Sequence, residues 1–393
     1  MRIAIFGARG IPHTYSGTET FFGELAPRLV ARGHDVIVYC RSSLFRERPK
    51  QYKGVRLVYL PSIETKNLST PSHTLGCVLD VLFRRVDVML VANVSNALLC
   101  IVPRMFGKNV ALNVDGLEWK RSKWSRIGRW YFHWNARLAG RICPDGIITD
   151  ALEMQRIYLQ EFNTRSVCIT YGANIEASSN PEVVRRYGLE PQGYYLIASR
   201  LVPENNADLI IKGFELSHST KLLAIAGDAN YRGAFVDKLK QTADRRVRFL
   251  GHVGDAEHVK ELHCNCYAYV HGHSVGGTNP ALLKALGYGN LVFAFDTLFN
   301  REVIANYGIL FSDPADFARK IAVLEEDPSQ AQKYRSHACR RILERYTWDH
   351  ITDQYEDYFH RLVQGERPAL DCELGMYAPK ENRAKSVQFV ASD

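Results

Sequence analysis

The chain repeats one pattern twice, in which short apolar runs alternate with segments of helical periodicity. In the first half the runs are RIAIFG, HDVIVYCR, VRLVYLP, VDVMLVAN, KNVALNVDG and GIITDA. In the second half they are YYLIASR, TKLLAIAGD, VRFLGHV, CYAYVHGH and NLVFAFDT. Continuous apolar strands joined through helices are typical of parallel sheets covered on both faces. The pattern predicts an α/β chain of two doubly wound, Rossmann-like units with ligands at the carboxyl ends of the strands.

A polar stretch at residues 172–188 separates the two halves. We expect an N-terminal Rossmann-like domain over residues 1–175 and a C-terminal, ligand-binding one over residues 176–345. The amphipathic segment 346–365 is expected to form a helix that packs across both domains. Residues 366–393 lack periodicity and predict a loosely ordered tail. Two such sheets side by side leave a cleft in which a ligand can bind.

Cysteine usage and the N-terminus bear on the compartment. Nine cysteines are scattered and mostly lie in apolar runs, which is typical of reduced thiols in a cytoplasmic protein. The N-terminus enters a strand directly, so we expect no signal peptide. The apolar segment 86–107 is interrupted by polar residues and is not expected to span a bilayer. The net charge of +8 favours anionic partners.

A glycine-rich turn, FGARGIPHTYSGTET, joins the first strand to a helix that is expected to start near Thr18. It lacks the G-x-G-x-x-G fingerprint of dinucleotide-binding turns. We expect a loop that covers a ligand and includes Gly10, Gly17 and Thr18. The alternative is a plain tight turn.

The stretch HGHSVGGTNPALLKAL runs from a strand end through two glycines and a proline into a helix. Glycines let the backbone approach a ligand closely, and a helix N-terminus offers N–H donors that suit a phosphate. We expect the amides of Gly277, Thr278 and Asn279 to donate to it. The alternative is an ordinary glycine turn that caps a core helix.

Three stretches in order carry a resemblance to a known family. GIPHTYSGTETFFGELAPRLVARGHDVIVYCR, NVDGLEWKRSKW and HGHSVGGTNPALLKAL with FAFDTLFNREV resemble the rhamnosyltransferase-type branch of the retaining GT-B glycosyltransferases, family four. The similarity covers most of residues 1–365. It implies a GT-B fold with a nucleotide-sugar donor mainly on the C-terminal domain and the acceptor on the N-terminal side. Members of this branch commonly use dTDP-L-rhamnose without a metal, so no cofactor is expected.

The resemblance also implies donor-binding positions. In IASRLVPENN, Arg200 matches the arginine that holds the donor phosphates, and the family's lysine position is Asn205; Arg200 could instead pair with a surface carboxylate. Two acidic positions of the family are occupied here by Gly276 and Lys284. An ammonium cannot accept ribose hydroxyl protons, so Lys284 reaches a phosphate, ribose is held elsewhere, or activity is impaired. His273, at a strand end, is expected to touch the donor.

Candidate catalytic acids lie in the N-terminal half. Asp115 ends the strand of NVDGLEWKRSKW, where a carboxylate can orient an acceptor hydroxyl or stabilise charge on the sugar ring. Glu118 and Glu19 are the second and third candidates. The alternative is that Asp115 only caps a turn with Gly116.

Residues 119–141 hold four of the five tryptophans and seven basic residues. On one helix, Trp124, Trp130 and Trp134 would form a stripe flanked by arginines, which suits peripheral contact with an anionic membrane. The other interpretation is a core helix with a solvated rim. Nucleic acid is not an expected partner, because no recognised module surrounds the segment.

A second cluster, HCNCYAYVHGH, contains His263, Cys264, Cys266, His271 and His273. The spacing lacks the usual separations of zinc ligands, and a strand would point alternate side chains apart. We therefore expect no metal.

Together these features predict a cytoplasmic glycosyltransferase, peripheral at the inner face of the membrane, that moves a hexosyl or deoxyhexosyl group to a saccharide or lipid-linked acceptor. L-Rhamnose from dTDP-rhamnose is the expected donor, with retention. The alternatives are a catalytically impaired homologue that binds glycan or a partner, and a nucleotide-sugar epimerase or hydrolase on the same fold.

Overall fold

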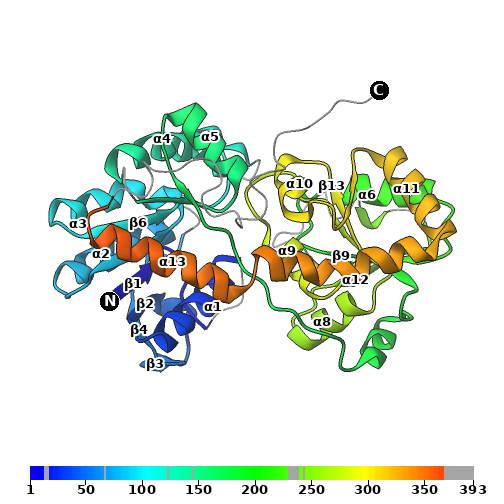
Figure 1. Ribbon diagram of the computed structural model, residues 1–393, viewed down its shortest axis with the longest axis horizontal. Coiled ribbons are helices and arrows are strands. Elements are labelled where there is room, and N and C mark those ends of the chain that lie inside the picture. The colour runs from blue at the N-terminus through cyan, green and yellow to red at the C-terminus, as the bar shows by residue number, and fades with distance from the viewer. Residues whose placement is uncertain are drawn as a thin grey trace. The chain divides into compact units, whose positions relative to one another are not determined.

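The computed structural model divides the chain into two compact units (Figure 1). It describes residues 1–12, 17–65, 68–121, 124–143, 146–228, 239–241 and 244–366. The first unit contains Met1–Trp119, Trp124–Tyr171 and the segment that begins at Thr347, and the second contains Gly172–Tyr346. In the described ranges, no helix has the length and apolarity that crossing a membrane requires.

The first unit is built on an eight-stranded sheet of order β3-β4-β2-β1-β5-β6-β7-β8. Its strands are β1 Arg2–Phe6, β2 Asp35–Arg41, β3 Gln51–Tyr52, β4 Val55–Leu60, β5 Val88–Ala92, β6 Asn109–Asn113, β7 Ile147–Thr149 and β8 Val167–Cys168. All pairs are parallel except β3 with β4, which form a short hairpin. The predicted parallel sheet is confirmed, and the antiparallel edge strand β3 is an addition to it.

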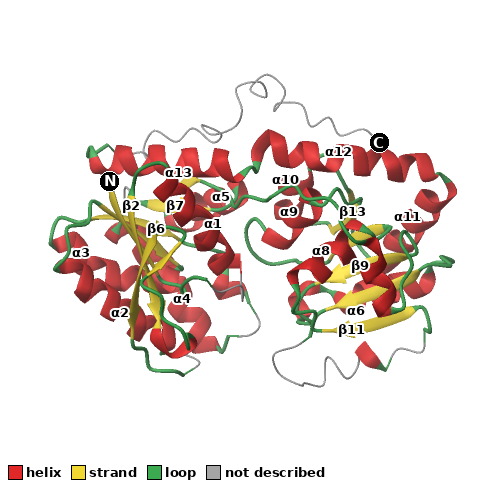
Figure 2. Ribbon diagram, turned by 90° about the horizontal axis from the view of Figure 1, so that it is seen from below, coloured by secondary structure: helices red, strands yellow, loops and turns green. Residues whose placement is uncertain are grey.

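Helices cover both faces of this sheet, as Figure 2 shows. They are α1 Gly17–Ala31, α2 Ser69–Leu82, α3 Ile101–Met105, α4 Arg126–Ile142, α5 Leu152–Phe162 and α13 Trp348–Val363, with 3₁₀ turns η1 Ser42–Leu44, η2 Val94–Cys100 and η3 Glu118–Lys120. α1 packs with α13, whereas α2 and α4 both pack on η2. The central strands are buried on both sides, which explains their unbroken apolar sequences.

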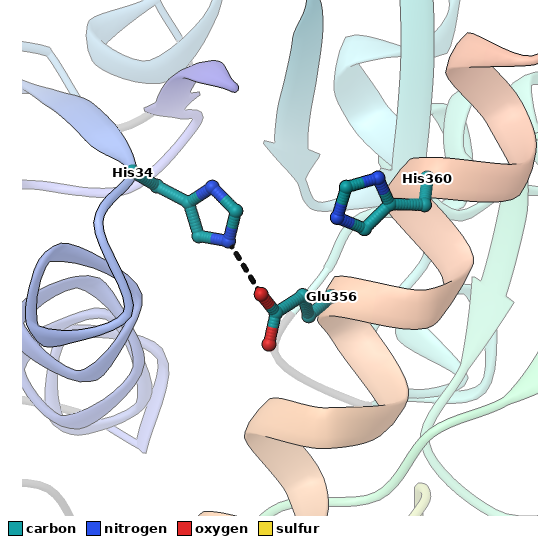
Figure 3. A group of neighbouring side chains, drawn as sticks. All are labelled: His34, Glu356 and His360. Carbon is teal, nitrogen blue, oxygen red and sulfur yellow. Dashed lines mark hydrogen bonds and ion pairs between the residues drawn. The ribbon is translucent and has the colours of Figure 1, made fainter.

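The last helix, α13, joins the N-terminal unit although it ends the described chain. It contacts α1, β5 and β6. His34 Nε2 lies 2.8 Å from Glu356 Oε1 (Figure 3). Arg32 binds the other carboxylate oxygen at 2.8 Å. Burial acts to raise the pKa of Glu356, but hydrogen bonds from Arg32 and His34 outweigh it, so the carboxylate stays charged. These contacts fix α13 to the first unit.

The second unit is built on a six-stranded parallel sheet of order β11-β10-β9-β12-β13-β14. Its strands are β9 Tyr194–Ala198, β10 Leu222–Ala226, β11 Val247–Gly251, β12 Ala268–His271, β13 Val292–Phe295 and β14 Ile309–Phe311. Its helices are α6 Ala207–Leu216, α8 Ala256–Cys264, α9 Pro280–Gly287, α10 Leu298–Ile304, α11 Pro314–Glu326 and α12 Pro328–Arg345, with 3₁₀ turns η4 Pro181–Tyr187 and η5 Pro203–Asn205. Both doubly wound units are therefore confirmed.

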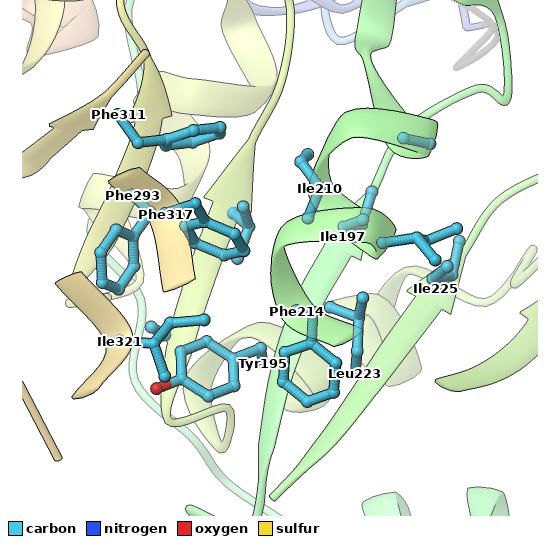
Figure 4. Packing of buried hydrophobic residues seen from close by; sticks show 14 of the residues in the cluster. Tyr195, Ile197, Ile210, Phe214, Leu223, Ile225, Phe293, Phe311, Phe317 and Ile321 are labelled. Atoms are coloured by element: carbon cyan, nitrogen blue, oxygen red, sulfur yellow. The ribbon is translucent and has the colours of Figure 1, made fainter. Parts of the chain in front are cut away.

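Aromatic packing between this sheet and helices α6 and α11 forms the core of the second unit (Figure 4). The Phe293 ring meets Phe317 edge to face at a centroid distance of 5.3 Å. A Cβ at Gly213 of α6 would lie 2.7 Å from the carbonyl oxygen of Pro314. The absence of a side chain at Gly213 lets α6 and α11 approach closely enough to cover one face of the sheet.

Candidate functional site

Strand order locates the ligand-binding edge of each unit. In the first unit the order reverses between β1 and β5, and in the second between β9 and β12. Open parallel sheets bind ligands beyond the carboxyl ends of strands at such a reversal. Of the sequence-predicted residues, Arg200 follows β9 and His273 follows β12, so two predicted donor contacts flank the reversal of the second sheet.

The loops that follow β9 and β12 are joined by hydrogen bonds. Asn206 Nδ2 donates to the Gly272 carbonyl at 2.7 Å, and the Ser274 amide donates to the Glu204 carbonyl at 2.9 Å. A Cβ at Gly272 would lie only 2.1 Å from the Asn205 carbonyl oxygen. Glycine is therefore required at position 272 for the two loops to meet.

Asn205 connects these loops through its side chain. Its Nδ2 donates to the Arg200 carbonyl at 2.7 Å, and its Oδ1 lies 2.7 Å from Nδ1 of His273. Since the amide oxygen can only accept, His273 Nδ1 carries the proton. Burial, with the Arg200 charge acting in the same direction, lowers the pKa of His273 to about 4. His273 is therefore neutral, and Asn205 holds Arg200 and His273 in place.

His273 has a further support that the sequence does not reveal. Asn300, buried at the start of α10, donates through Nδ2 to the carbonyls of His273 at 2.9 Å and Phe295 at 2.8 Å. It ties the loop after β12 to the end of β13.

The Arg200 guanidinium is exposed at the end of β9. No residue in the described ranges forms a hydrogen bond or an ion pair with this guanidinium. An exposed guanidinium at a strand end can bind an anion through charge-assisted, bidentate contacts.

The turn before α9 has the expected helix-start geometry. Gly276 has a φ of 114°, a conformation that favours glycine. Asn279 is the N-cap, its Oδ1 accepting from the Ala281 amide at 2.9 Å, and Pro280 is the first helical residue. Thr278 is buried. The segment Gly276–Asn279 thus lies beside His273 and leads into the positive end of a helix dipole.

Lys284 lies apart from this helix start. Its side chain is exposed, and its Nζ lies 5.6 Å from the ring centroid of Tyr288, which follows the last residue of α9. Burial of the ammonium lowers the pKa of Lys284, and the Glu176 carboxylate acts in the opposite direction. The ammonium thus points toward the C-terminal end of α9.

A buried histidine adds a polar atom to the same edge. His271, the last residue of β12, is 3% exposed, and its Nδ1 lies 3.2 Å from the Tyr269 hydroxyl. Its Nε2 is buried and has no hydrogen-bond partner within the described part of the chain. Burial lowers the pKa of His271 to about 3, so the ring is neutral. Such an atom is costly unless a ligand or water meets it.

In the first unit, Asp115 follows β6 in a left-handed conformation with φ 56°. Its amide donates to Asn113 Oδ1 at 3.0 Å, and Asn113 Nδ2 in turn binds the Tyr355 hydroxyl of α13 at 3.0 Å. The Tyr171 hydroxyl donates to Asp115 Oδ1 at 3.4 Å. Burial, then the Asp115 charge, raise the pKa of Tyr171, so it remains a donor. Three residues absent from the sequence-based set hold Asp115 in place. Tyr171 binds its carboxylate, Asn113 accepts from its amide, and Tyr355 binds Asn113.

The other candidate acids have structural contacts. Glu118 is buried in η3, and one of its oxygens accepts from Trp124 Nε1 at 2.7 Å. Glu19 lies in the first turn of α1, is 3% exposed, and accepts from the Arg9 amide at 3.1 Å. Asp115 therefore lies at the end of β6, whereas Glu118 is held by Trp124 and Glu19 by the Arg9 amide.

The glycine-rich N-terminal turn is described only in part. Gly10 has a φ of 110°, and a Cβ there would lie 2.5 Å from Cys40 Sγ. Gly17 and Thr18 form the start of α1. The intervening residues 13–16 of the predicted loop lie outside the described ranges.

The tryptophan-rich segment differs from the expected helix. α4 begins at Arg126, with the Ser125 hydroxyl accepting from the Gly128 amide at 3.2 Å, so Trp124 precedes the helix. Trp124 packs on Phe132, whereas Trp130 and Trp134 are exposed. The prediction that Trp124 lies on the same helix as Trp130 and Trp134 is therefore wrong.

One group of three potential metal ligands occurs among the described residues: His34, Glu356 and His360 (Figure 3). His34 Nδ1 lies 3.1 Å from the N-terminal ammonium of Met1, which can only donate, so Nε2 carries the proton that Glu356 accepts. Glu356 also binds Arg32. His34 Nε2 and the Glu356 carboxylate are thus already engaged in the contacts that hold α13 on the first unit.

Comparison with known proteins follows the same division of the chain. Residues 181–341 match the family model Glycosyl transferases group 1, and residues 90–174 match Domain of unknown function (DUF1972). None of the curated protein sequences matches the chain.

Solved structures with the same fold include HepE of Anabaena in complex with UDP. It is 16% identical, with a TM-score of 0.73, over 92% of this chain and 100% of that chain. Sucrose-phosphate synthase of Thermosynechococcus elongatus is 13% identical, with a TM-score of 0.75, over 93% and 100%. The chain has the GT-B fold, and residues 181–341 of its second half are similar to the group 1 glycosyl transferases.

Proposed function

We propose that the chain is a retaining glycosyltransferase that moves L-rhamnose from dTDP-rhamnose to a saccharide or lipid-linked acceptor in surface polysaccharide synthesis. The observation that carries the proposal is the pair of locked loops at the reversal of the second sheet. They bring the exposed Arg200 guanidinium and the helix start at Gly276–Asn279 to the ends of adjacent strands.

The donor diphosphate is bound without a metal. Arg200 supplies a charge-assisted contact, and the amides of Gly277, Thr278 and Asn279 supply donors at the positive end of α9. His273 and the buried Nε2 of His271, for which no described residue is a hydrogen-bond partner, lie at the same edge and contact the sugar or ribose. The UDP complex of HepE supports a nucleoside diphosphate as the ligand class.

Asp115 acts on the acceptor side of the reaction. In the proposed transfer the C1–O bond to the diphosphate breaks, and a bond from the acceptor oxygen to C1 forms on the same face. The acceptor proton passes to the leaving phosphate oxygen. Asp115, held by Asn113 and Tyr171, orients the acceptor hydroxyl, while Glu118 and Glu19 shape the surrounding loops.

A binding assay tests this function. The purified chain is heated with dTDP-rhamnose, UDP-glucose or UDP-N-acetylglucosamine, and the unfolding temperature is compared with that of the free protein. A ligand at 100 times its Kd stabilises the fold by about 2.7 kcal/mol. We expect dTDP-rhamnose to give the largest shift; the absence of a shift with all three contradicts the proposal.

Lys284 is the observation behind the second candidate, an impaired homologue. Lys284 stands at the position where the resemblance implies an acidic residue that contacts ribose. Its ammonium lies beside Tyr288. Donor binding without transfer to any acceptor would favour this candidate. Release of free sugar or of an altered nucleotide-sugar without acceptor would favour a hydrolase or epimerase.

A further inference from the structure

One surface of the first unit exposes large apolar side chains. Among the described residues, the five most exposed are Phe83 (91%), Met105 (80%), Ile127 (79%), Phe106 (69%) and Trp130 (66%). They lie at the ends of α2 and α3 and on α4. Single exposed apolar residues are normal, but a concentration on neighbouring elements marks an interaction surface.

These elements form one layer on the face of the sheet away from α13, as Figure 2 shows. α4 is tied to η2, since the Tyr131 hydroxyl donates to the Ser95 carbonyl at 2.9 Å. The ends of α2 and α3 meet, since Lys108 Nζ donates to the Arg84 carbonyl at 3.1 Å. The exposed side chains therefore belong to one continuous surface, which we call the α2–α4 face.

The sequence of α2 produces half of this face. Leu75, Leu79 and Phe83 recur every four residues and are exposed, whereas Cys77 and Val81 between them are buried. The helix is thus apolar toward the core and also along a stripe toward solvent. A helix that only covers a sheet needs polar residues on that outer side.

Positive charge surrounds the apolar side chains. α4 carries Arg126, Arg129, Arg137 and Arg141, all exposed, and it has no acidic residue. At the ends of α2 and α3, Asp80 is neutralised by its ion pair with Arg84, and Arg85, Arg104 and Lys108 add further positive charge.

We propose that the α2–α4 face docks on an anionic lipid bilayer. Phosphate headgroups complement the arginines, and the acyl boundary takes up the tryptophan and phenylalanine side chains. A second copy of the chain fits less well, because a symmetric contact would bring the α4 arginines against each other. This proposal rests on the proposed function in one respect only, the lipid-linked acceptor. Docking on the bilayer would bring that acceptor to the enzyme.

Vesicle flotation with the full chain tests the docking without donor or turnover. The protein is mixed with vesicles of phosphatidylcholine alone or with 30% phosphatidylglycerol, at low and high salt. We expect binding only to the anionic vesicles, weakened by salt. Absence of binding to anionic vesicles overturns the proposal, while donor-induced thermal stabilisation in the same preparation still reports on the proposed function.

Two double variants locate the contact. F83S with F106S removes apolar surface, and R126E with R129E reverses charge. Each is expected to lower the fraction bound at equal lipid by about tenfold or more. Because these side chains are exposed, the unfolding temperature should stay near that of the wild type.

Matched control variants lie on the second unit. Leu343 is 65% exposed on α12, and the Arg340 side chain on the same helix is 67% exposed. L343S and R340E should bind vesicles as the wild type does. An equal loss in these controls overturns the proposal. The proposal is also overturned if the wild type does not float with vesicles but forms a dimer in analytical ultracentrifugation, and the F83S with F106S variant dissociates that dimer.

Discussion

Asn205 Oδ1 lies 2.7 Å from His273 Nδ1, although 68 positions separate the two residues in the chain. The same side chain donates to the carbonyl of Arg200. Asn205 occupies the position where the family resemblance implies a phosphate-binding lysine, yet it is only 9% exposed. The structure uses it as a positioning residue that joins two ligand-facing loops.

Replacing Asn205 by aspartate changes the titration of His273. A carboxylate next to an imidazole favours its protonated form, so N205D should raise the His273 pKa from about 4 by at least about one unit. The pH dependence of the His273 ring signals in NMR measures this. Equal titration in both proteins would show that the two side chains are not in contact in solution.

Removing the Arg200 guanidinium weakens nucleotide binding. A hydrogen bond to a charged group contributes about 1.5–3 kcal/mol, so R200A should raise the Kd for dTDP by about 10- to 100-fold. Isothermal titration calorimetry measures the change. R319A removes a guanidinium that is 70% exposed on α11 and should leave the Kd unaltered. Equal Kd values for R200A and the wild type would exclude Arg200 from the phosphate site.

Asp115 is expected to affect turnover and not donor affinity. D115N keeps the size of the side chain but removes its charge, so kcat should fall by about 100-fold while the dTDP Kd stays constant. Steady-state kinetics with the acceptor, and calorimetry without it, separate the two quantities. E118Q, at a glutamate engaged by Trp124, should reduce kcat less. A D115N enzyme with wild-type kcat would contradict the assigned role.

Glu261 on α8 should make the stability of the second unit pH-dependent. It is fully buried and accepts from the Ser179 and Asn180 amides at 2.7 and 2.9 Å. Burial acts to raise its pKa, but these bonds and that of Ser178 lower it to about 2. A depressed pKa stabilises the fold above the unfolded value near 4.5, and that stability is lost as the pH falls toward 2.

The measurement for Glu261 is urea unfolding of E261Q and the wild type across this range. Above pH 5 the wild type should be more stable by about 3 kcal/mol, and the difference should shrink as the pH falls. E182Q, at a glutamate that is 70% exposed, is the control and should show little difference. A constant gap between E261Q and the wild type would contradict the hydrogen-bond network.

Much of the fold could be predicted from the sequence, because buried parallel strands have continuous apolar runs. The missed strands, β3, β8 and β14, have two or three residues and leave no such run. A stripe through Trp124 requires an uninterrupted helix, but Ser125 is the N-cap of α4, so Trp124 precedes the helix.

Only those residues of the candidate site that directly follow a strand could be predicted from the sequence. Arg200 and the turn at Gly276–Asn279 follow strands, so their place at the edge of the sheet follows from the pattern. The contacts of Asn205 with His273 and of Asn113 with Tyr355 join residues 68 and 242 positions apart. No spacing rule reveals such pairs, because tertiary packing alone brings them together.

The proposed binding of a diphosphate at the strand ends of the second unit depends on backbone amides and one guanidinium. A crystal structure of the chain with dTDP tests it most directly. We expect phosphate oxygens at about 2.7–3.2 Å from the amides of Gly277, Thr278 and Asn279 and from the Arg200 guanidinium. A diphosphate bound elsewhere, with these amides and Arg200 in contact only with water, would contradict the account.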